Sequence, residues 1–552
     1  MNPYEFAASN RPFSTLIEVS TFVGFLLTRA LIIFLCALTA TAVQASSSIN
    51  KRSLENTIEK ALNSFQTPGM AVGILYQNKV VLSKGFGAAN IDAQTPVDAQ
   101  TYFRLASTSK AFTSAALAIL VDEEKIDWND KVITHLPEFQ LYDPYVTREF
   151  TILDLLTHRS GLLSGAGDSM IWPEPSGFSR AQVIANLQYL TPEYSFRASY
   201  AYSNVMYITA GELVAKISGI SFENFVEQRI FKPLGMNCFA GDIPKLNLNN
   251  VAMGYGHNDE RGIYAIPRNA ISQKGLMSAA AGGMVCNIED MLKWVSALLT
   301  RKNLPFSDEQ LNQMWYPQTI LWVSKRERQW DNTLFKSYGL GWRMANIGEL
   351  KVISHTGTLS GYQAYVLMVP KLELGVIILS NGSNSAARGS VMQTIVKAYM
   401  QQSGYLDTDQ QDWINTYIEH LDEREQAYLE GYEAPVPSAP MSINSEQILG
   451  QYKDKWFGSF NIVSSAQNTT NASPIIRISS DRMKTLTGTL IPFQDATYKI
   501  EWDNKNAAGD AFMHFTLNVK RDVTAATLHP FSVDIIVNHA YRDMTFIKVV
   551  TK

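Results

Sequence analysis

The chain has 552 residues, of which 46% are hydrophobic and 18% are charged, and its formal net charge at pH 7 is −4. This composition is typical of an ordinary soluble enzyme. It contains no basic block, no Gly-rich phosphate loop and no regular repeat, so we expect neither a nucleic-acid partner nor a solenoid. Its eight histidines are scattered without a His-x-x-x-His or Cys-x-x-Cys pair, so we expect no metal and no cofactor.

The N-terminal region carries an apolar run at residues 30–38 that follows Arg29 and precedes Val43-Gln44-Ala45. This arrangement is typical of a secretory signal peptide, so we predict that residues 1–45 are removed and that the protein is secreted or periplasmic. Further apolar residues at 22–27 leave an alternative, an uncleaved segment that anchors the chain in a membrane. Arg29 argues against the anchor, because a charge at the centre of a span costs ~2.5–3.5 kcal/mol.

Ser107-Thr108-Ser109-Lys110 stands at the head of an amphipathic stretch. Residues three apart lie one helical turn apart on one face, so Lys110 can reach Ser107. The apolar residues that follow predict a helix with one buried face: they are Ala111, Phe112, Ala115, Ala116, Ile119 and Leu120. The helix N-terminus favours negative charge, and burial lowers the proton affinity of a lysine. The tetrad therefore suggests a serine nucleophile with a lysine base, although a serine is also a common N-cap.

Tyr202-Ser203-Asn204 precedes a helical pattern over residues 206–217, so it is predicted to lie in a loop that enters a helix. In that position Tyr202 can share the proton transfer, and the amide of Asn204 can hold a substrate carbonyl. The alternative for the motif taken alone is an aromatic ring packed under the loop, with Asn204 as the N-cap.

His355-Thr356-Gly357 closes an alternating run at residues 351–354, and two further apolar runs follow at 361–369 and 374–379. These segments predict an antiparallel meander. Gly357 lets a ligand backbone approach closely, and a strand edge can pair with an extended substrate. Taken alone, His355 is more typical of a hydrogen-bonded histidine at a strand end.

Three prolines within residues 433–440 predict an extended linker, preceded by a charged, exposed helix over 410–432. Beyond the linker, residues 441–552 contain short β-rich runs separated by turns, which predict a small antiparallel barrel or sandwich. Residues 46–432 form the predicted main domain. Its cysteines, Cys238 and Cys286, either pair or stay buried and free.

Together the three motifs resemble the serine β-lactamase and penicillin-binding-protein superfamily, especially the class C β-lactamase-like hydrolases and D-peptidases. The resemblance spans residues 53–402, and its supporting phrases lie at residues 103–107, 155–162, 233–236, 281–284, 289–290 and 338–342. It implies an α+β fold, in which an antiparallel sheet is flanked by helices and interrupted by an inserted helical region. Residues 450–458 and 486–490 further resemble the lipocalin-like C-terminal β-barrel of some of these hydrolases, which is expected to be a lid or assembly surface rather than a module that binds envelope material.

The resemblance also implies roles for single residues. Ser107 would be the acylated nucleophile, Lys110 and Tyr202 the general-base pair, and His355 the catalytic-site residue that replaces a lysine. The backbone N–H groups of Ser107 and Thr358 would form the oxyanion hole. Asn204, Thr356 and Gly357 would contact the substrate.

The replacement of lysine by His355 bears on the substrate, because histidine is mostly neutral at pH 7 whereas Lys-Thr-Gly supplies a fixed positive charge. We therefore expect an acyl-serine hydrolase of small-molecule or peptide substrates, acting on D-peptide-like or β-lactam-like esters or amides, with weak β-lactam turnover. The alternative is a catalytically weak penicillin-recognising sensor or envelope scaffold. The sequence leaves the oligomeric state open.

Overall fold

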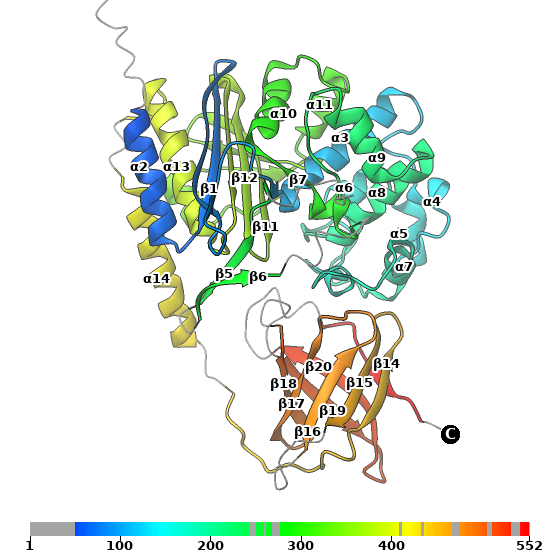
Figure 1. Ribbon diagram of the computed structural model, residues 1–552. Coiled ribbons are helices and arrows are strands. Elements are labelled where there is room, and N and C mark those ends of the chain that lie inside the picture. Colours follow the sequence, from blue (N-terminus) through cyan, green and yellow to red (C-terminus); the bar gives the residue numbers. More distant parts are fainter. Residues whose placement is uncertain are drawn as a thin grey trace, which may run out of the picture. The chain divides into compact units, whose positions relative to one another are not determined.

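The computed structural model of the protein describes residues 50–241, 250–258, 261–267, 276–407, 411–431, 435–465, 474–504, 511–530 and 541–550 (Figure 1). The predicted signal peptide at residues 1–45 lies outside these ranges, as does the start of the linker at 433–434. Within the described ranges, no single helix has the length and apolar character to cross a membrane. One pair does when joined across a 77° bend, Asn204–Ser218 with Phe222–Phe231.

A nine-stranded antiparallel sheet forms the centre of the main domain. In spatial order its strands are β3 (Thr95–Pro96), β2 (Lys79–Asn90), β1 (Gly69–Tyr76), β13 (Leu374–Ser380), β12 (Tyr362–Val369), β11 (Leu350–Leu359), β10 (Arg343–Ile347), β9 (Lys336–Tyr338) and β8 (Thr319–Ile320). The predicted meander is present as β11–β12–β13. The sequence suggested that His355-Thr356-Gly357 closes this strand. Strand β11 instead continues two residues beyond Gly357, so the motif lies within the strand.

Helices cover both faces of this sheet (Figure 1). On one face lie α2 (Lys51–Ser64), α13 (Ser385–Gln402) and α14 (Trp413–Gly431), and α10 (Ile288–Thr300) lies on the other. Glycines allow α10 to approach: a Cβ atom at Gly73 would come within 2.9 Å of Ile288, and one at Gly375 within 2.3 Å of Val295. The predicted charged helix is present as α14, and most of its C-terminal half is exposed.

The inserted helical region contains the segment that follows Ser107. Its helices are α3 (Lys110–Asp122), α4 (Val132–His135), α5 (Pro144–Glu149), α6 (Ile152–Leu156), α7 (Arg180–Asn186), α8 (Asn204–Ser218), α9 (Phe222–Val226) and α11 (Asp308–Met314). Helix α12 (Lys325–Asp331) instead packs against α13 and α14, where Asp331 pairs with Lys397 and Trp330 contacts Trp413. The predicted stripe on α3 is buried, but so is every other residue from Lys110 to Leu120. A helix that is buried all round is central to a core, so α3 has no exposed face where one was expected.

Two short pairs of strands and a disulfide complete this domain. Strands β4 (Phe103–Arg104) and β7 (Val285–Cys286) pair with each other, as do β5 (Gly254–Asn258) and β6 (Gly262–Ile266). Cys238 and Cys286 form a disulfide, which decides between the two alternatives that the sequence left open.

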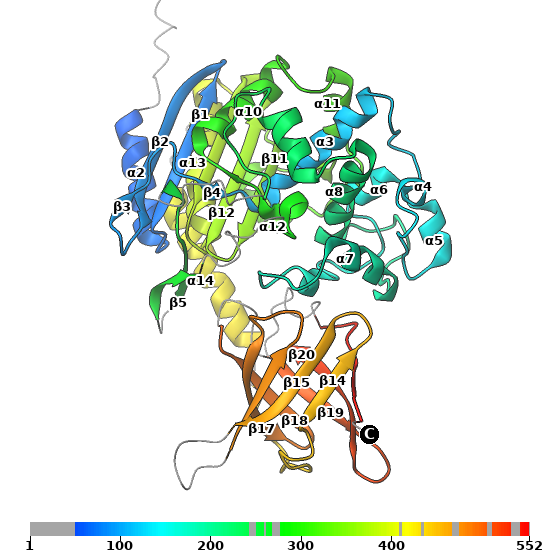
Figure 2. The ribbon, with the colours of Figure 1, turned by 45° about the vertical axis from the view of Figure 1, so that its right-hand side comes forward.

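The C-terminal strands form a closed eight-stranded barrel in sequence order, which confirms the predicted barrel (Figure 2). They are β14 (Gly450–Asp454), β15 (Gly458–Ser465), β16 (Ile475–Ser480), β17 (Thr487–Gln494), β18 (Thr497–Trp502), β19 (Ala511–Leu517), β20 (Val523–Pro530) and β21 (Phe546–Lys548). Buried and less buried residues alternate along β16 and β18, as they must when one face of a strand points into a barrel. Large aromatic side chains are buried within it, and the ring centroid of Phe460 lies 6.1 Å from that of Trp502 and 5.0 Å from that of Phe546.

Candidate active site

Ser107 lies in a short 3-10 turn, Ala106–Ser109, that leads directly into α3. Ala106 has a left-handed backbone with φ of 48°, a conformation that costs a residue other than glycine about 1–3 kcal/mol. Close backbone contacts hold this turn, because a Cβ atom at Gly357 would come within 2.4 Å of Leu105 O and 3.1 Å of Ser107 N. Ser107 is half-buried, whereas its neighbours from Leu105 to Lys110 are buried. The turn therefore leaves the serine as the accessible residue of this segment.

Lys110 is fully buried and points back to the serine. Its Nζ lies 3.3 Å from Ser107 Oγ, 2.7 Å from Asn204 Oδ1 and 2.6 Å from Ala281 O. Burial lowers the pKa of Lys110 well below its usual value, partly offset by the negative charge of Asp168. The predicted meeting of Ser107 and Lys110 is thus present, with an amine that gives up its proton more readily than an exposed lysine does.

Asn204 is the first residue of α8, and Ser203 occupies the N-cap position. The N-cap role considered for Asn204 is therefore wrong. Its side chain instead accepts a hydrogen bond from Lys110 through Oδ1 and donates one from Nδ2 to Asp168 Oδ2 at 2.9 Å. Burial raises the pKa of Asp168 to about 7, against the opposing effects of Asn204 and Lys110. Asp168, Asn204, Lys110 and Ser107 therefore form one chain of hydrogen bonds.

Tyr202 lies beside this chain, with its ring centre 4.7 Å from Lys110 Nζ. Its hydroxyl is buried and faces Ser107. Burial raises the pKa of Tyr202 above its usual value, while Arg343 and Ser107 act in the opposite direction. The tyrosine is therefore neutral at pH 7 and its hydroxyl retains its proton.

His355 lies on β11 and is 1% exposed. Its Nε2 lies 2.9 Å from the hydroxyl of Tyr338, and its Nδ1 lies 2.7 Å from Thr356 O. A carbonyl only accepts, so Nδ1 carries the proton and Nε2 accepts from Tyr338. Burial lowers the pKa of His355 well below its usual value. The ring is therefore neutral and both of its nitrogens are already bonded, which corresponds to the hydrogen-bonded histidine that the isolated motif suggested.

Gly357 and Thr358 run along the Ser107 turn. Gly357 was predicted to admit a ligand backbone, but the backbone that approaches it is that of Leu105 and Ser107. Arg388 donates to the carbonyl of Gly357 and, at 3.1 Å, to Thr358 Oγ1. Thr358 is exposed and Thr356 is half-buried. The structure thus brings Gly357 against the Ser107 turn, and Thr358 follows it in β11.

Comparison with known proteins shows which family has a similar sequence. The family model described as Beta-lactamase matches residues 54–399. The chain belongs to the beta-lactamase family. It is 28% identical over 356 residues to the unguisins hydrolase ungD' of Aspergillus campestris, over 62% of this chain and 64% of that protein. It therefore spans just under two thirds of the length of that relative.

Other members of the beta-lactamase family are comparably distant. The chain is 27% identical over 383 residues to a beta-lactamase of Escherichia coli K12, over 63% of this chain and 93% of that protein. A solved structure, the octameric penicillin-binding protein homologue from Pyrococcus abyssi, matches with a TM-score of 0.57 and 20% identity over 91% of this chain and 100% of that one. At this identity the likeness shows a shared fold alone. Membership in the family supports a function of the serine hydrolase type.

Several residues of this beta-lactamase-family site were missed by sequence reasoning: they are His158, Asp168, Tyr338, Arg343 and Arg388. Asp168 reaches the site from the short 3-10 helix Asp168–Met170, 36 residues before Asn204, where no local pattern marks it. His158 and Tyr338 lie within sequence phrases that resemble the family, and that was the signal that could have found them. Their rings meet with centroids 4.5 Å apart, and His158 Nδ1 accepts from Ser203 N at 3.0 Å.

Arg343 on β10 lies close to two of the tyrosines of the site. Its guanidinium lies 5.6 Å from the ring centre of Tyr338 and 6.0 Å from that of Tyr202. Its Nη1 is buried and has no hydrogen-bond partner in the described ranges. Arg343 is paired in register with Ser354, the residue before His355. A positive charge therefore stands next to the position where the family's usual lysine is replaced.

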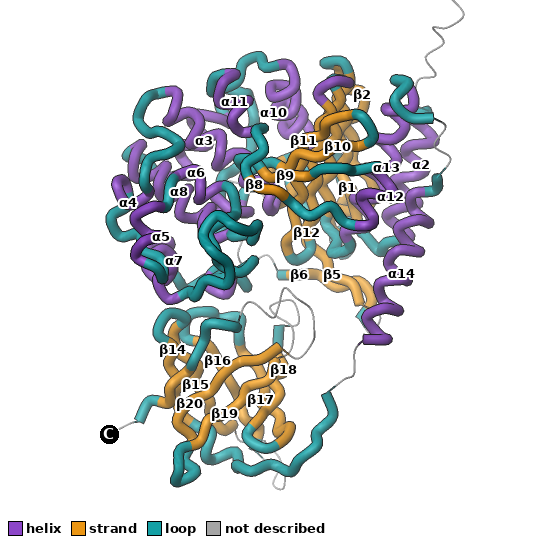
Figure 3. The backbone as a smooth tube through the Cα atoms, turned by 180° about the vertical axis from the view of Figure 1, so that it is seen from behind, coloured by secondary structure: helices purple, strands orange, loops and turns teal. Residues whose placement is uncertain are grey.

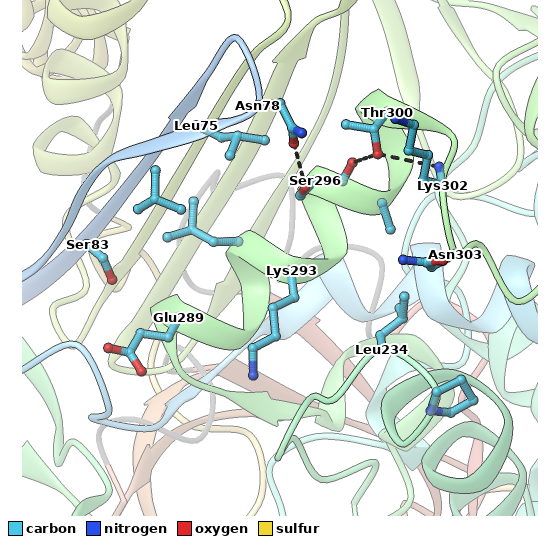
Figure 4. A pocket seen from close by; sticks show the side chains of 14 residues that line it. Leu75, Asn78, Ser83, Leu234, Glu289, Lys293, Ser296, Thr300, Lys302 and Asn303 are labelled. Atoms are coloured by element: carbon cyan, nitrogen blue, oxygen red, sulfur yellow. Dashed lines mark hydrogen bonds between the residues drawn. The ribbon is translucent and has the colours of Figure 1, made fainter.

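Two other features do not belong to this site. Cys238, Cys286 and Asp290 are the one group of described side chains spaced closely enough to hold a metal ion. The two sulfurs are bonded to each other, and Asp290 accepts from Asn237 N, Asn287 and Lys293. A groove of about 670 Å³ lies between the β1–β2 hairpin and α10, where Ser296 contacts Asn78, and none of the predicted site residues lines it (Figure 4).

Proposed function

We propose that the protein is a serine hydrolase that forms a covalent acyl-serine intermediate on Ser107, with esters or amides as substrates. The observation that carries this proposal is the set of groups around Lys110 Nζ. Asn204 Oδ1 and Ala281 O can only accept hydrogen bonds, whereas the hydroxyl of Ser107 can also donate one. As a neutral amine, Lys110 has two N–H groups for Asn204 Oδ1 and Ala281 O. Its lone pair is then left for the hydroxyl proton of Ser107.

The chemistry follows from this geometry. Lys110 takes the proton of Ser107 while Oγ attacks the acyl carbon, and backbone N–H groups at Ser107 and Thr358 stabilise the oxyanion. Lys110 passes the proton it took from Ser107 to the leaving group, either directly or through the hydroxyl of Tyr202, which gives up its own proton and takes the one from Lys110. Lys110, neutral again, takes a proton from the water that attacks the acyl-serine ester and returns it to Ser107 Oγ as the acid is released.

The sheet side of the site bears on the substrate. His355 is neutral and fully bonded, so the charge that a lysine supplies in Lys-Thr-Gly is missing at that position. This supports weak turnover of β-lactams. Arg343 supports binding of D-peptide-like substrates that carry a carboxylate near the scissile bond, because a guanidinium binds carboxylates well.

We also propose that the protein is secreted or periplasmic. The disulfide between Cys238 and Cys286 supports this, because disulfides persist mainly in oxidising compartments. Mass spectrometry of the protein from its native host is expected to find a mature N-terminus directly after Ala45. An intact residue 1 on a membrane-bound chain would contradict it.

Steady-state kinetics with p-nitrophenyl acetate, D-alanyl peptides and nitrocefin test the proposed activity. We expect turnover of the ester and of at least one peptide, with kcat/KM for nitrocefin well below ~10⁶ M⁻¹s⁻¹, a value of an efficient enzyme. An Arg343→Met variant is expected to lose about tenfold or more on peptides with a free carboxylate, the size of one charge-assisted hydrogen bond, and little on the neutral ester. Labelling of Ser107 without turnover of any substrate would instead favour a sensor.

A further inference from the structure

Four large apolar side chains are exposed close together at the edge of the nine-stranded sheet, on β8 and on the segment that leads into β9. They are Ile320 at 88%, Trp322 at 83%, Leu334 at 84% and Phe335 at 56% exposure, and we call them the edge patch. Figure 3 shows β8 and β9 at this edge of the sheet. Soluble proteins rarely expose several such residues together, and such patches mark binding surfaces.

Strand pairing places the members of the edge patch next to one another. Ile320 pairs with Ser337, and Leu321 N donates to Lys336 O at 2.9 Å. Continuing this register by one residue puts Trp322 opposite Phe335, and side chains of directly opposite residues share a face. Ile320, Trp322 and Phe335 therefore share one face of this edge. Leu334 is exposed next to Phe335 in the chain.

This surface does not serve the site around Ser107. Thr319 pairs with Tyr338, whose hydroxyl donates to His355, and Thr319 Oγ1 donates to Thr157 O at 2.8 Å. Side chains alternate between the two faces of a strand, so Ile320 and Trp322 point away from the face that carries Tyr338. The edge patch therefore lies on the face of this edge opposite to Tyr338.

Positive charges border the edge patch. Helix α12 begins three residues after Trp322 and carries Lys325, Arg326 and Arg328, none of which forms an ion pair with a residue that the structure describes. The guanidinium of Arg328 lies 5.7 Å from the ring centre of Trp322.

The acidic residues of α12 are already neutralised by pairing. Glu327 pairs with Lys336, and Asp331 lies 3.0 Å from Lys397. Arg328 thus places an unpaired positive charge beside Trp322, and Lys325 and Arg326 lie on the same short helix.

We propose that the edge patch and the cations of α12 attach the protein to the surface of an anionic lipid bilayer. Apolar and aromatic side chains that enter the boundary between headgroups and acyl chains, bordered by lysine and arginine, are the features of interfacial membrane binding. Tryptophan suits this boundary because its ring is apolar and its N–H is polar. This proposal does not depend on the hydrolase chemistry.

A second copy of the chain fits the same surface less well. A two-fold contact through the edge patch would bring the cations of one copy against those of the other, and like charges across an interface are unfavourable. An anionic bilayer offers the complementary charge together with an apolar interior.

Hydrogen–deuterium exchange of the full chain tests the proposal locally, with and without vesicles of phosphatidylcholine and phosphatidylserine in a 70:30 ratio. Amides of residues 319–323 and 334–337 are expected to exchange more slowly with these vesicles, and to do so less at high salt or with phosphatidylcholine alone. This readout is independent of any attachment through the N-terminal segment. Unchanged exchange at these amides would overturn the proposal.

Vesicle flotation of variants gives the second measurement. A double variant, Trp322→Ser with Phe335→Ser, is expected to lose about tenfold or more in affinity for the anionic vesicles, because it removes two large apolar side chains from the contact. The matched control is Tyr145→Ser on α5, an aromatic residue with 61% exposure outside the edge patch, and it should bind like the wild type. Labelling of Ser107 checks that each variant is folded. Equal binding of the double variant would overturn the proposal, as would a wild-type dimer that the double variant turns into a monomer.

Discussion

The helical side and the sheet side of the site differ in how their polar groups are used. On the helical side, Lys110, Asn204 and Asp168 form a chain in which both ionisable groups have shifted pKa values. On the sheet side, His355 and Tyr338 bond to each other and stay neutral. The difference indicates that protons move on the helical side, whereas the sheet side supplies backbone, shape and the separate charge of Arg343.

The largest expected effect is on the helical side. Replacing Lys110 with Met removes the base while keeping an apolar chain of similar length, so we expect kcat/KM for p-nitrophenyl acetate to fall about 10³-fold, within the range of general-base catalysis. The control is Lys84→Met on β2, an exposed lysine paired with Glu55, which should leave kcat/KM unchanged. More than a tenth of wild-type activity in the Lys110 variant would assign the proton transfer to another group.

The next largest expected effect is on stability, and it concerns the buried ion pair between Arg104, just before the Ser107 turn, and Glu174 in the helical region. Glu174 is bonded to both Nη atoms of Arg104 at 2.7 and 3.1 Å and accepts from Ser278. Breaking one partner of a buried pair leaves an uncompensated charge, so Glu174→Gln should lower the free energy of unfolding by about 3–5 kcal/mol, measured by urea denaturation. Glu55→Gln, which breaks the exposed pair with Lys84, should cost about 0–1 kcal/mol. Equal losses in the free energy of unfolding for the two variants would show that burial does not make the pair of Glu174 and Arg104 more important for stability.

On the sheet side, Tyr338→Phe removes the hydroxyl that donates to His355. A buried nitrogen is then left without its donor, so stability should fall by about 1–3 kcal/mol in the same urea measurement. Because His355 takes no part in the proton transfer, kcat/KM should stay close to wild type. A large loss of kcat/KM in a folded variant would mean that the two sides do not differ as described.

The smallest effect is a change in pH dependence from Asp168→Asn. Asparagine keeps an oxygen that can accept from Asn204 but removes the negative charge, which raises the pKa of Lys110 in the wild type. Without that charge Lys110 loses its proton at lower pH. The acid limb of the pH profile of kcat/KM should therefore move to lower pH with little change in its plateau, and an unmoved limb would show that Asp168 acts only as a structural acceptor.

The sequence predicted the features that depend on local patterns. The Ser107 tetrad, the meander β11–β12–β13 and the barrel strands near residues 458–463, 475–478, 498–502 and 512–517 were all visible, because each combines a short motif with a regular apolar period. Strands β8, β9 and β10 were missed, since strands of two, three and five residues carry little periodic signal.

Local sequence patterns could not predict which distant residues contact each other in the site. Asp168 meets Asn204 across 36 residues, and Arg104 meets Glu174 across 70. Such pairs depend on how helices pack, which periodicity alone does not specify. For the same reason, the single buried face predicted for α3 underestimated how far the helix is enclosed.

Intact-mass spectrometry of the protein after treatment with a fluorophosphonate or penicillin probe tests the central claim most directly. The account predicts one covalent adduct on the wild type, none on Ser107→Ala, and a much slower adduct on Lys110→Met. An adduct of equal extent on Ser107→Ala, or no adduct on the folded wild type with either probe, would contradict an acyl-serine mechanism at Ser107.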